Sequence, residues 1–374
     1  MNRTPTIYDV AERAGVSKSL VSLVLRDSPR VSDEKREAVL VAVAELNYTP
    51  SRLAAGLAGT RTRGIGIVID EFENLWFAPA LEGLRAALGS GGYSLSVADT
   101  SLNAHLGLDP LEVFRSLRVD GIVLAGEVPA DAAERLAVPT VILGTRAITV
   151  PQAPVIASDE HAGGRLATAH LADLGHRDIA CVSGPGASAA AREAGYLAEM
   201  LDRGLTPRVL RATQTSEAAA RAVAAEVLGG GAAVAVPSDR PRPAREQPGA
   251  HAAGDIAVGG VAAGDVETVR GREPGAAPTA VFAVNDPMAV GVIGAARDHG
   301  VDVPRQLSVV GYDDSPLAAY ELISLTSVSG DPRRLGEVAG RTLAGMLEGG
   351  VDPARSRLLA PSLVVRRSTA PRVT

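Results

Sequence analysis

The stretch from Thr6 to Arg26, TIYDVAERAGVSKSLVSLVLR, constrains the fold of this chain more than any other stretch. Its pattern predicts two short helices joined by a tight turn. Thr6 is the expected cap of the first helix, because Asp9 follows it at the capping-box spacing. Gly15 is expected to end that helix, since glycine adopts the left-handed turn at little cost. Ser17 is then the expected cap of the second helix.

The second predicted helix has two different sides. Val21, Val24 and Leu25 fall on one side at ~100° per residue. The opposite side and the N-terminal end carry polar, cationic and methyl-bearing side chains, namely Lys18, Ser19, Ser22, Leu23 and Arg26. A small helix that buries one side and presents such groups on the other fits the major groove of DNA. The alternative is an ordinary helical hairpin whose outer side faces solvent.

Four sequence blocks continue this pattern over about 60 residues and make a specific match. They are D-V-A-E-R-A-G-V-S, V-S-L-V-L-R, V-S-D-E-K-R and A-E-L-N-Y-T-P-S-R-L-A-A-G-L-A-G. In this order they resemble the N-terminal headpiece of the lac-repressor (LacI/GalR) family of bacterial transcription regulators. The resemblance continues more weakly to the C-terminus. It implies a homodimer that binds near-palindromic operator DNA and is controlled by a small-molecule effector, with a sugar as the expected class.

The headpiece should be completed by a third helix from Ser32 to Asn47, which Pro50 prevents from continuing. The next segment, residues 51–58, is short and contains a glycine, so we expect no stable helix there in isolation. The resemblance implies that it becomes a hinge helix on the operator and inserts Leu57 into the minor groove as an apolar wedge. A plain linker is the alternative.

Ten side chains are therefore the expected DNA contacts. They are Thr6, Tyr8, Ser17, Lys18, Ser19, Ser22, Leu23, Arg26, Arg52 and Leu57. Among them, Lys18, Ser19 and Leu23 should face bases. Leu23 departs from the polar residue often found there in the family, and its methyl groups favour contact with thymine.

From Gly64 onward the sequence pattern alternates between apolar strands and helices. This alternation predicts a parallel sheet with helices on both faces. The expected fold is an N-terminal all-α helix-turn-helix headpiece followed by an α/β two-lobed periplasmic-binding-protein-like (type I) effector domain. The expected domains are residues 1–50 (headpiece), 51–63 (hinge helix and linker) and 64–374 (effector binding and dimerisation). Lobe 1 is expected over 64–158 and 327–349, and lobe 2 over 159–326 and 350–374. Residues 229–278 are rich in Pro, Gly and Ala and are expected to form a flexible insert.

Open α/β folds bind ligands at the carboxyl ends of their strands. The resemblance implies an effector-binding role for Arg192 in A-R-E-A-G-Y and for Asp313 in G-Y-D-D. A guanidinium group has forked donors that can hold neighbouring hydroxyls or a carboxylate. Asn285 in V-N-D offers a donor and an acceptor. Trp76 and Phe77 occupy the aromatic place of the first lobe and could stack on a ring.

Each effector residue also has a simpler interpretation. Arg192 could be a helix-surface charge, Asp313 a loop cap and Trp76 a core residue. Asn285 and Asp286 could simply set the turn before Pro287.

Net charge is distributed unevenly along the chain. Residues 1–63 hold 10 Lys and Arg against 7 Asp and Glu, or +3, and the remainder holds 27 against 36, or −9. The chain's two lysines, Lys18 and Lys35, both lie in the basic part. A basic head on an acidic body fits phosphate contact at one end.

Enzyme classes find little support in the sequence. A loose dinucleotide fingerprint, Gly184-x-Gly186-x-x-Ala189, lacks the acidic residue expected about 20 positions later. No Gly-Lys pair exists, which excludes a Walker A loop, and six scattered histidines and one cysteine form no metal spacing. We therefore expect no catalytic site, cofactor or metal.

The sequence also bears on the cell compartment. It has no apolar run of transmembrane length, and its N-terminus lacks the apolar core of a signal peptide. These features predict a cytoplasmic protein without membrane contact. The rival hypothesis, a solute-binding protein without gene control, predicts export.

Overall fold

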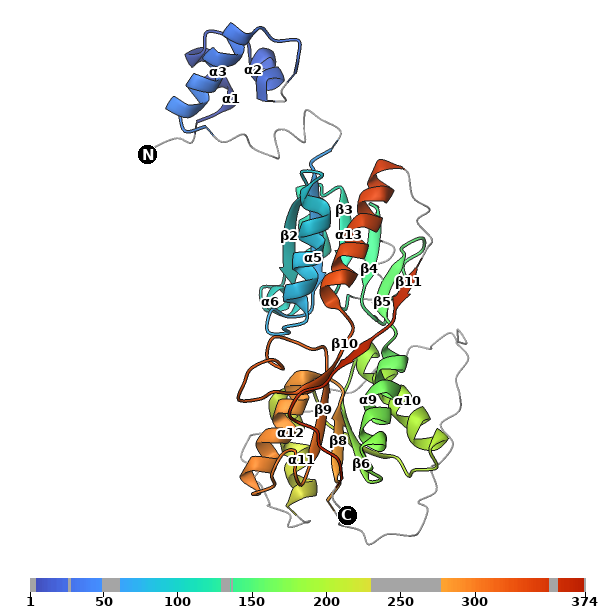
Figure 1. Cartoon of the computed structure of the whole chain (residues 1–374). Coiled ribbons are helices and arrows are strands. Elements are labelled where there is room, and N and C mark those ends of the chain that lie inside the picture. The colour runs from blue at the N-terminus through green and yellow to red at the C-terminus, as the bar shows by residue number, and fades with distance from the viewer. Residues whose placement is uncertain are drawn as a thin grey trace, which may run out of the picture. The chain divides into compact units, whose positions relative to one another are not determined.

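The computed structural model describes residues 5–25, 28–48, 61–128, 135, 137–229, 277–349 and 356–372. The chain divides into two compact units, residues 1–159 with 330–361 (unit 1) and residues 160–329 with 362–374 (unit 2). Unit 1 contains three N-terminal helices and a six-stranded sheet, and unit 2 contains a second six-stranded sheet (Figure 1). Within the described ranges, no helix is both long and apolar enough to cross a membrane.

The three N-terminal helices form the predicted headpiece. They are α1 (Ile7–Arg13), α2 (Lys18–Leu25) and α3 (Asp33–Glu45). Gly15 follows α1 with φ +65°, as the predicted turn requires. Val10, Val21 and Val39, one from each helix, are fully buried in a core that consists of headpiece residues alone. The predicted helix-turn-helix is therefore confirmed.

The sheet of unit 1 is parallel throughout and has the strand order β11-β5-β4-β3-β1-β2. Its strands are β1 (Gly64–Ile69), β2 (Ser94–Asp99), β3 (Gly121–Leu124), β4 (Thr140–Leu143), β5 (Val155–Ser158) and β11 (Arg357–Leu359). Helices α5 (Phe77–Gly89) and α13 (Pro332–Glu348) share an apolar core with one face (Figure 1). Helix α7 (Pro110–Leu117) packs on the other face, and the short α6 (Thr100–His105) follows β2.

The sheet of unit 2 has the order β12-β10-β9-β8-β6-β7, with only β12 antiparallel to its neighbour among these pairs. Its strands are β6 (Ile179–Ser183), β7 (Arg208–Arg211), β8 (Ala280–Ala283), β9 (Ser308–Tyr312), β10 (Thr326–Ser329) and β12 (Ser362–Val364). Its helices are α9 (Glu160–Asp173), α10 (Ala187–Asp202), α11 (Glu217–Leu228) and α12 (Asp286–Asp298). Helices α9 and α10 pair with each other, as do α11 and α12 (Figure 1). The predicted two-lobed α/β fold is confirmed.

Glycines allow the paired helices to approach each other very closely. A Cβ atom built on Gly83 of α5 would lie 2.0 Å from the carbonyl oxygen of Arg333, at the start of α13. One built on Gly164 of α9 would lie 2.0 Å from the carbonyl oxygen of Arg192 in α10. Because the atoms met are backbone atoms, the helices could not keep these positions with any larger residue.

The sequence pattern gives no clear signal for three of the described elements, β5, α6 and β11. Strand β11 pairs with β5, so residues 357–359 belong to unit 1, whereas the sequence assigned residues 350–374 to lobe 2. Residues 327–329 were expected in lobe 1. They belong instead to β10, which pairs with β9 and β12 of unit 2. The final strand, β12, is short and covers only residues 362–364.

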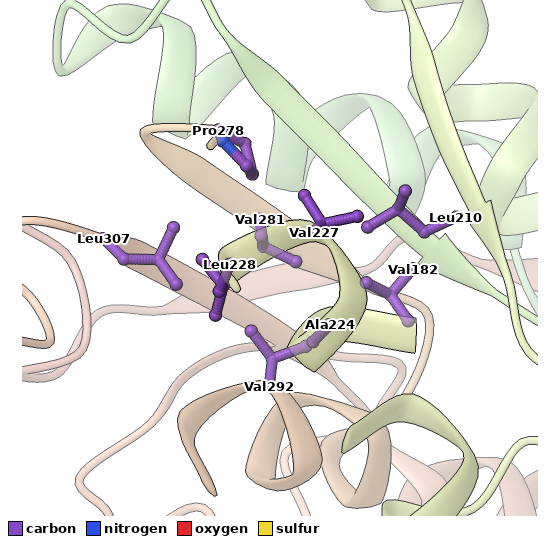
Figure 2. Close-up of a pocket in the computed structure, with 9 residues that line it drawn as sticks. All are labelled: Val182, Leu210, Ala224, Val227, Leu228, Pro278, Val281, Val292 and Leu307. Atoms are coloured by element: carbon purple, nitrogen blue, oxygen red, sulfur yellow. The ribbon is translucent and has the colours of Figure 1, made fainter. Parts of the chain in front are cut away.

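An apolar cavity lies under α11 in unit 2 (Figure 2). Its empty volume is about 210 Å³, part of it open to solvent. It is lined by Val182, Leu210, Ala224, Val227, Leu228, Pro278, Val281, Val292 and Leu307. Since none of these side chains is polar, the cavity has no side-chain group that could orient a polar ligand.

Candidate functional sites

Helix α2 of the headpiece presents its polar side to solvent. Val21 and Val24 are buried on the opposite side. The side chains expected to contact DNA remain accessible. Ser17, Lys18, Ser19 and Leu23 are exposed, and Ser22 is half-buried. This is the arrangement that a groove-reading helix needs, because its base-contacting groups must not be engaged in the protein core.

Tyr8 of α1 and Lys18 of α2 contact each other on this exposed surface. The Lys18 ammonium donates a hydrogen bond to the Tyr8 hydroxyl at 3.3 Å and lies 5.0 Å from the centre of the Tyr8 ring. Such a contact restricts the position of a flexible cation.

Thr6 has a structural role in α1, since both its N–H and its hydroxyl donate to the Asp9 carboxylate at 2.6 Å. The remaining expected contacts, Arg26, Arg52 and Leu57, lie outside the described residues.

In unit 2, Arg192 of α10 is buried and joins three separate segments. Its Nε donates to Glu160 at 2.7 Å, and its Nη1 donates to the Val284 carbonyl oxygen at 2.7 Å. Its Nη2 lies 3.0 Å from the Asp313 carboxylate, and the guanidinium carbon lies 3.7 Å from the centre of the Tyr312 ring. Arg192 is thus no surface charge.

The electrostatics of this cluster follow from burial and close pairing. Burial disfavours the charged guanidinium, but the Asp313 and Glu160 carboxylates outweigh it and raise the pKa of Arg192 above its ordinary value. Burial, opposed by Arg192, raises the pKa of Asp313 to about 7. The backbone is also strained here, because Asp313 has φ +101° and Asp314 has φ +46°. Strain of this kind concentrates at ligand sites.

Asn285 precedes α12 and Asp286 begins it, and both side chains make hydrogen bonds to neighbouring segments. The Asn285 side chain accepts from the Met288 N–H at 2.8 Å and donates to the Thr215 carbonyl oxygen at 2.9 Å. It therefore caps α12. Asp286 is fully buried and accepts from the Ser315 N–H and the Ser327 hydroxyl. Burial raises the pKa of Asp286 to about 6, although these hydrogen bonds oppose the shift.

In unit 1, the two aromatic candidates differ in exposure. Phe77 is 2% exposed and belongs to the core beneath α5, whereas Trp76 is half-buried and its ring meets Phe77 edge-on. The Arg146 guanidinium lies 5.7 Å from the Trp76 ring centre and 3.3 Å from the Asp70 carboxylate. Trp76 is therefore the candidate that keeps accessible ring surface.

The structure adds residues that the sequence analysis missed. Glu160 is buried against Arg192, and Arg146 joins Trp76 to Asp70. Glu160 begins α9, where an acidic residue is ordinarily favoured, so its place in the sequence carries no signal of a binding role. Arg146 carries no local motif at all. These contacts exist only in the folded chain.

Comparisons with known proteins agree with this fold. Family models match residues 6–51 ("Bacterial regulatory proteins, lacI family"), 62–229 ("Periplasmic binding proteins and sugar binding domain of LacI family") and 234–369 ("Periplasmic binding protein-like domain"). The HTH-type transcriptional repressor PurR of Vibrio campbellii is 32% identical, with 97% of this chain and 98% of that protein covered. The HTH-type transcriptional regulator DegA of Bacillus subtilis is 29% identical, with 98% of each covered.

Solved structures give the same answer. The lac repressor dimer bound to operator and the anti-inducer ONPF is 26% identical, with a TM-score of 0.74 over 98% of this chain and 100% of that chain. The complex of transcriptional regulator CelR with cellobiose is 26% identical, with a TM-score of 0.62 over 97% and 99%. A headpiece that presents a reading helix, followed by a two-lobed α/β body, defines a DNA-binding transcription regulator. The chain belongs to the LacI family of bacterial regulatory proteins.

Proposed function

We propose that this protein is a transcriptional repressor that reads a near-palindromic operator as a homodimer and is controlled allosterically by a small polar effector, a sugar being the favoured class. The observation that carries the proposal is the exposed polar side of α2, with Lys18 held by Tyr8. Gene regulation, rather than catalysis, is then its activity. Because its proposed partner is chromosomal DNA, we also propose a cytoplasmic location.

On DNA, Lys18, Ser19 and Leu23 contact base edges, and Ser22 reaches either a base or a phosphate. Leu23 is 37% exposed, so its methyl groups are available to a thymine methyl. Thr6, Tyr8, Ser17, Arg26 and Arg52 complete the proposed interface. Leu57 is the proposed minor-groove wedge of the hinge helix.

A second copy of the chain is the proposed partner in the dimer. Strand β2 is an edge strand, and Val97 on it is exposed. Leu102, Leu106 and Leu108 lie just beyond it and are also exposed. These four residues fall within twelve positions of the sequence, and exposed apolar patches often mark protein contact surfaces. The lac repressor, to which this chain is similar, has been solved as a dimer on its operator.

For the effector, Arg192 and Asp313 are the proposed central contacts, and Trp76 stacks on a ring face. Asn285 and Phe77 then contribute indirectly, by positioning the residues around them. Asn285 caps α12, and Phe77 packs in the core of unit 1. The cellobiose bound to CelR supports a sugar as the ligand class. An effector acts by its differential affinity for two states of the protein, typically about 1–3 kcal/mol.

The two lysines of the chain allow a matched test of the DNA interface. Lys18→Ala should weaken binding to the operator by about 1–3 kcal/mol and binding to random DNA by much less, because base contacts carry specificity. Lys35→Ala removes the same charge from α3 and should weaken both complexes alike or neither. Fluorescence anisotropy with both duplexes at fixed salt measures this. An equal loss on both duplexes for Lys18→Ala would reduce Lys18 to a phosphate contact.

A further inference from the structure

The carboxyl ends of the strands in unit 2 carry more negative than positive charge. Four carboxyl groups lie there, on Glu160, Asp286, Asp313 and Asp314. Two guanidinium groups pair with three of them, Arg192 with Glu160 and Asp313, and Arg366 with Asp314 at 2.7 Å. Four carboxylates against two guanidinium groups give a net charge of −2 when all are ionised, and the raised pKa values of Asp286 and Asp313 show that this negative charge is already unfavourable here.

Arg192 cannot serve as the counter-ion of an acidic ligand without losing its own partners. Its charge already faces two buried carboxylates, and a third N–H donates to Val284. A further anion at this arginine would bring a third negative charge into a site where burial already raises the pKa of Asp313. Neutral hydroxyl groups can accept from the remaining N–H groups without that repulsion.

A buried hydroxyl provides a separate indication of the ligand's chemistry. Ser183 ends β6 and is fully buried, and its Oγ has no hydrogen-bond partner among the described residues. Val182 pairs with Ala283 in the adjacent strand, which places Ser183 beside Val284, the acceptor of Arg192. A hydroxyl can both donate and accept, so it suits a hydroxyl-bearing ligand.

We infer that the effector of this regulator is a hydroxyl-bearing molecule that is uncharged or cationic, and that phosphorylated and carboxylated molecules are rejected. The inference rests on the proposed function, since it names the ligand class of the same site. Like charges juxtaposed at a binding site select against the wrong partner. The excess carboxyl groups at the carboxyl ends of the strands in unit 2 therefore act as the specificity element.

The test uses the full chain bound to a labelled operator duplex. A small-molecule extract of the source cells is divided on an anion-exchange resin into an unretained fraction and a retained, anionic fraction. Both are supplied at equal ionic strength, because salt alone weakens DNA binding. The unretained fraction should change operator affinity at least fivefold and raise the thermal unfolding midpoint of the protein. The retained fraction should do neither.

Matched probes then measure the discrimination directly. For hexose, pentose, disaccharide and nucleoside scaffolds, the neutral, amino and phosphorylated forms are compared by thermal shift, for example glucose, glucosamine and glucose 6-phosphate. The phosphorylated form should bind at least tenfold more weakly than its neutral parent. Asp314→Asn removes a carboxylate of the unit 2 cluster and frees Arg366, so it should narrow the difference in affinity between the neutral and phosphorylated forms. Glu348→Gln removes an exposed charge at the end of α13 and should leave that difference unchanged.

The outcomes separate the inference from the proposed function. A retained fraction that alters operator binding, or a phosphorylated probe that binds as tightly as its parent, overturns the inference and leaves effector control intact. If operator binding is normal and neither fraction changes it, effector control itself fails and the inference fails with it.

Discussion

Replacement of Arg192 by alanine is expected to lower the free energy of unfolding of unit 2 by about 3–5 kcal/mol, the range for breaking a buried ion pair from one side. The variant leaves Glu160 and Asp313 buried without their cation, and the Val284 carbonyl loses its donor. Most of this loss comes from leaving two carboxylates buried and unpaired. The net contribution of the ion pairs to stability is smaller, because desolvation offsets much of their attraction in the native protein.

Urea denaturation of the full chain measures this change. Arg221→Ala is the control, because Arg221 pairs with Asp298 at 2.6 Å but is exposed, and exposed pairs contribute about 0–1 kcal/mol. Arg192→Lys keeps the charge without the forked donors and should fall between the two. A loss under 1 kcal/mol for Arg192→Ala would show that this cluster does not hold the three segments together.

Arg192→Ala also tests the proposed effector-binding role of Arg192, provided that the variant is measured under conditions where it remains folded. Arg192→Ala should abolish the response of operator binding to effector at a temperature where the variant remains folded. Because the headpiece has its own core, its operator affinity without effector should persist. A surviving effector response would mean that Arg192 only positions Asp313 and that the ligand contacts lie elsewhere.

Gly83→Ala is expected to destabilise unit 1 by about 3 kcal/mol, at the upper end of the overpacking range. The added methyl group would meet the Arg333 carbonyl oxygen at 2.0 Å, and a backbone atom cannot move aside like a flexible side chain. Helices α5 and α13 must then separate, which opens the core that they share with the sheet.

Gly89→Ala in the same helix is the matched control. A Cβ at Gly89 has no atom within 4 Å, so only helix propensity changes, and alanine should be neutral or stabilising by up to about 1 kcal/mol. Thermal and urea unfolding of both variants give the comparison. Equal midpoints for Gly83→Ala and Gly89→Ala would contradict the close helix packing.

Much of the fold followed from local pattern. Short apolar runs such as GIGIVI became buried strands, and Thr6, Gly15 and Ser17 marked the headpiece helices where the sequence placed them. The missed elements lack that signal. Helix α6, TSLNAH, has no buried residue and is fixed by Asp99, which caps it by accepting from Leu102 N–H at 2.8 Å. Strand β11 is mostly exposed and exists because β5 offers an edge.

In the candidate sites, too, the sequence indicates which residues matter but not which contacts they make. Lys18 was predictable as an exposed cation from helix periodicity, but its contact with Tyr8 depends on how α1 crosses α2. Arg192 and Asp313 were singled out by resemblance, whereas their buried pairing joins residues 121 positions apart along the chain. The motif identified the residues, and only the tertiary structure showed that they neutralise each other.

The central claim, that a DNA-reading headpiece is governed by a small-molecule sensor in one chain, is tested most directly by operator affinity. Anisotropy titrations compare the full chain on duplexes from upstream of its own gene with scrambled duplexes, with and without the active extract fraction. One fragment should be bound at least about 10³-fold more tightly than its scrambled form. Its affinity should change at least about fivefold with effector. Equal affinity for every duplex, unaltered by any fraction, would contradict the claim.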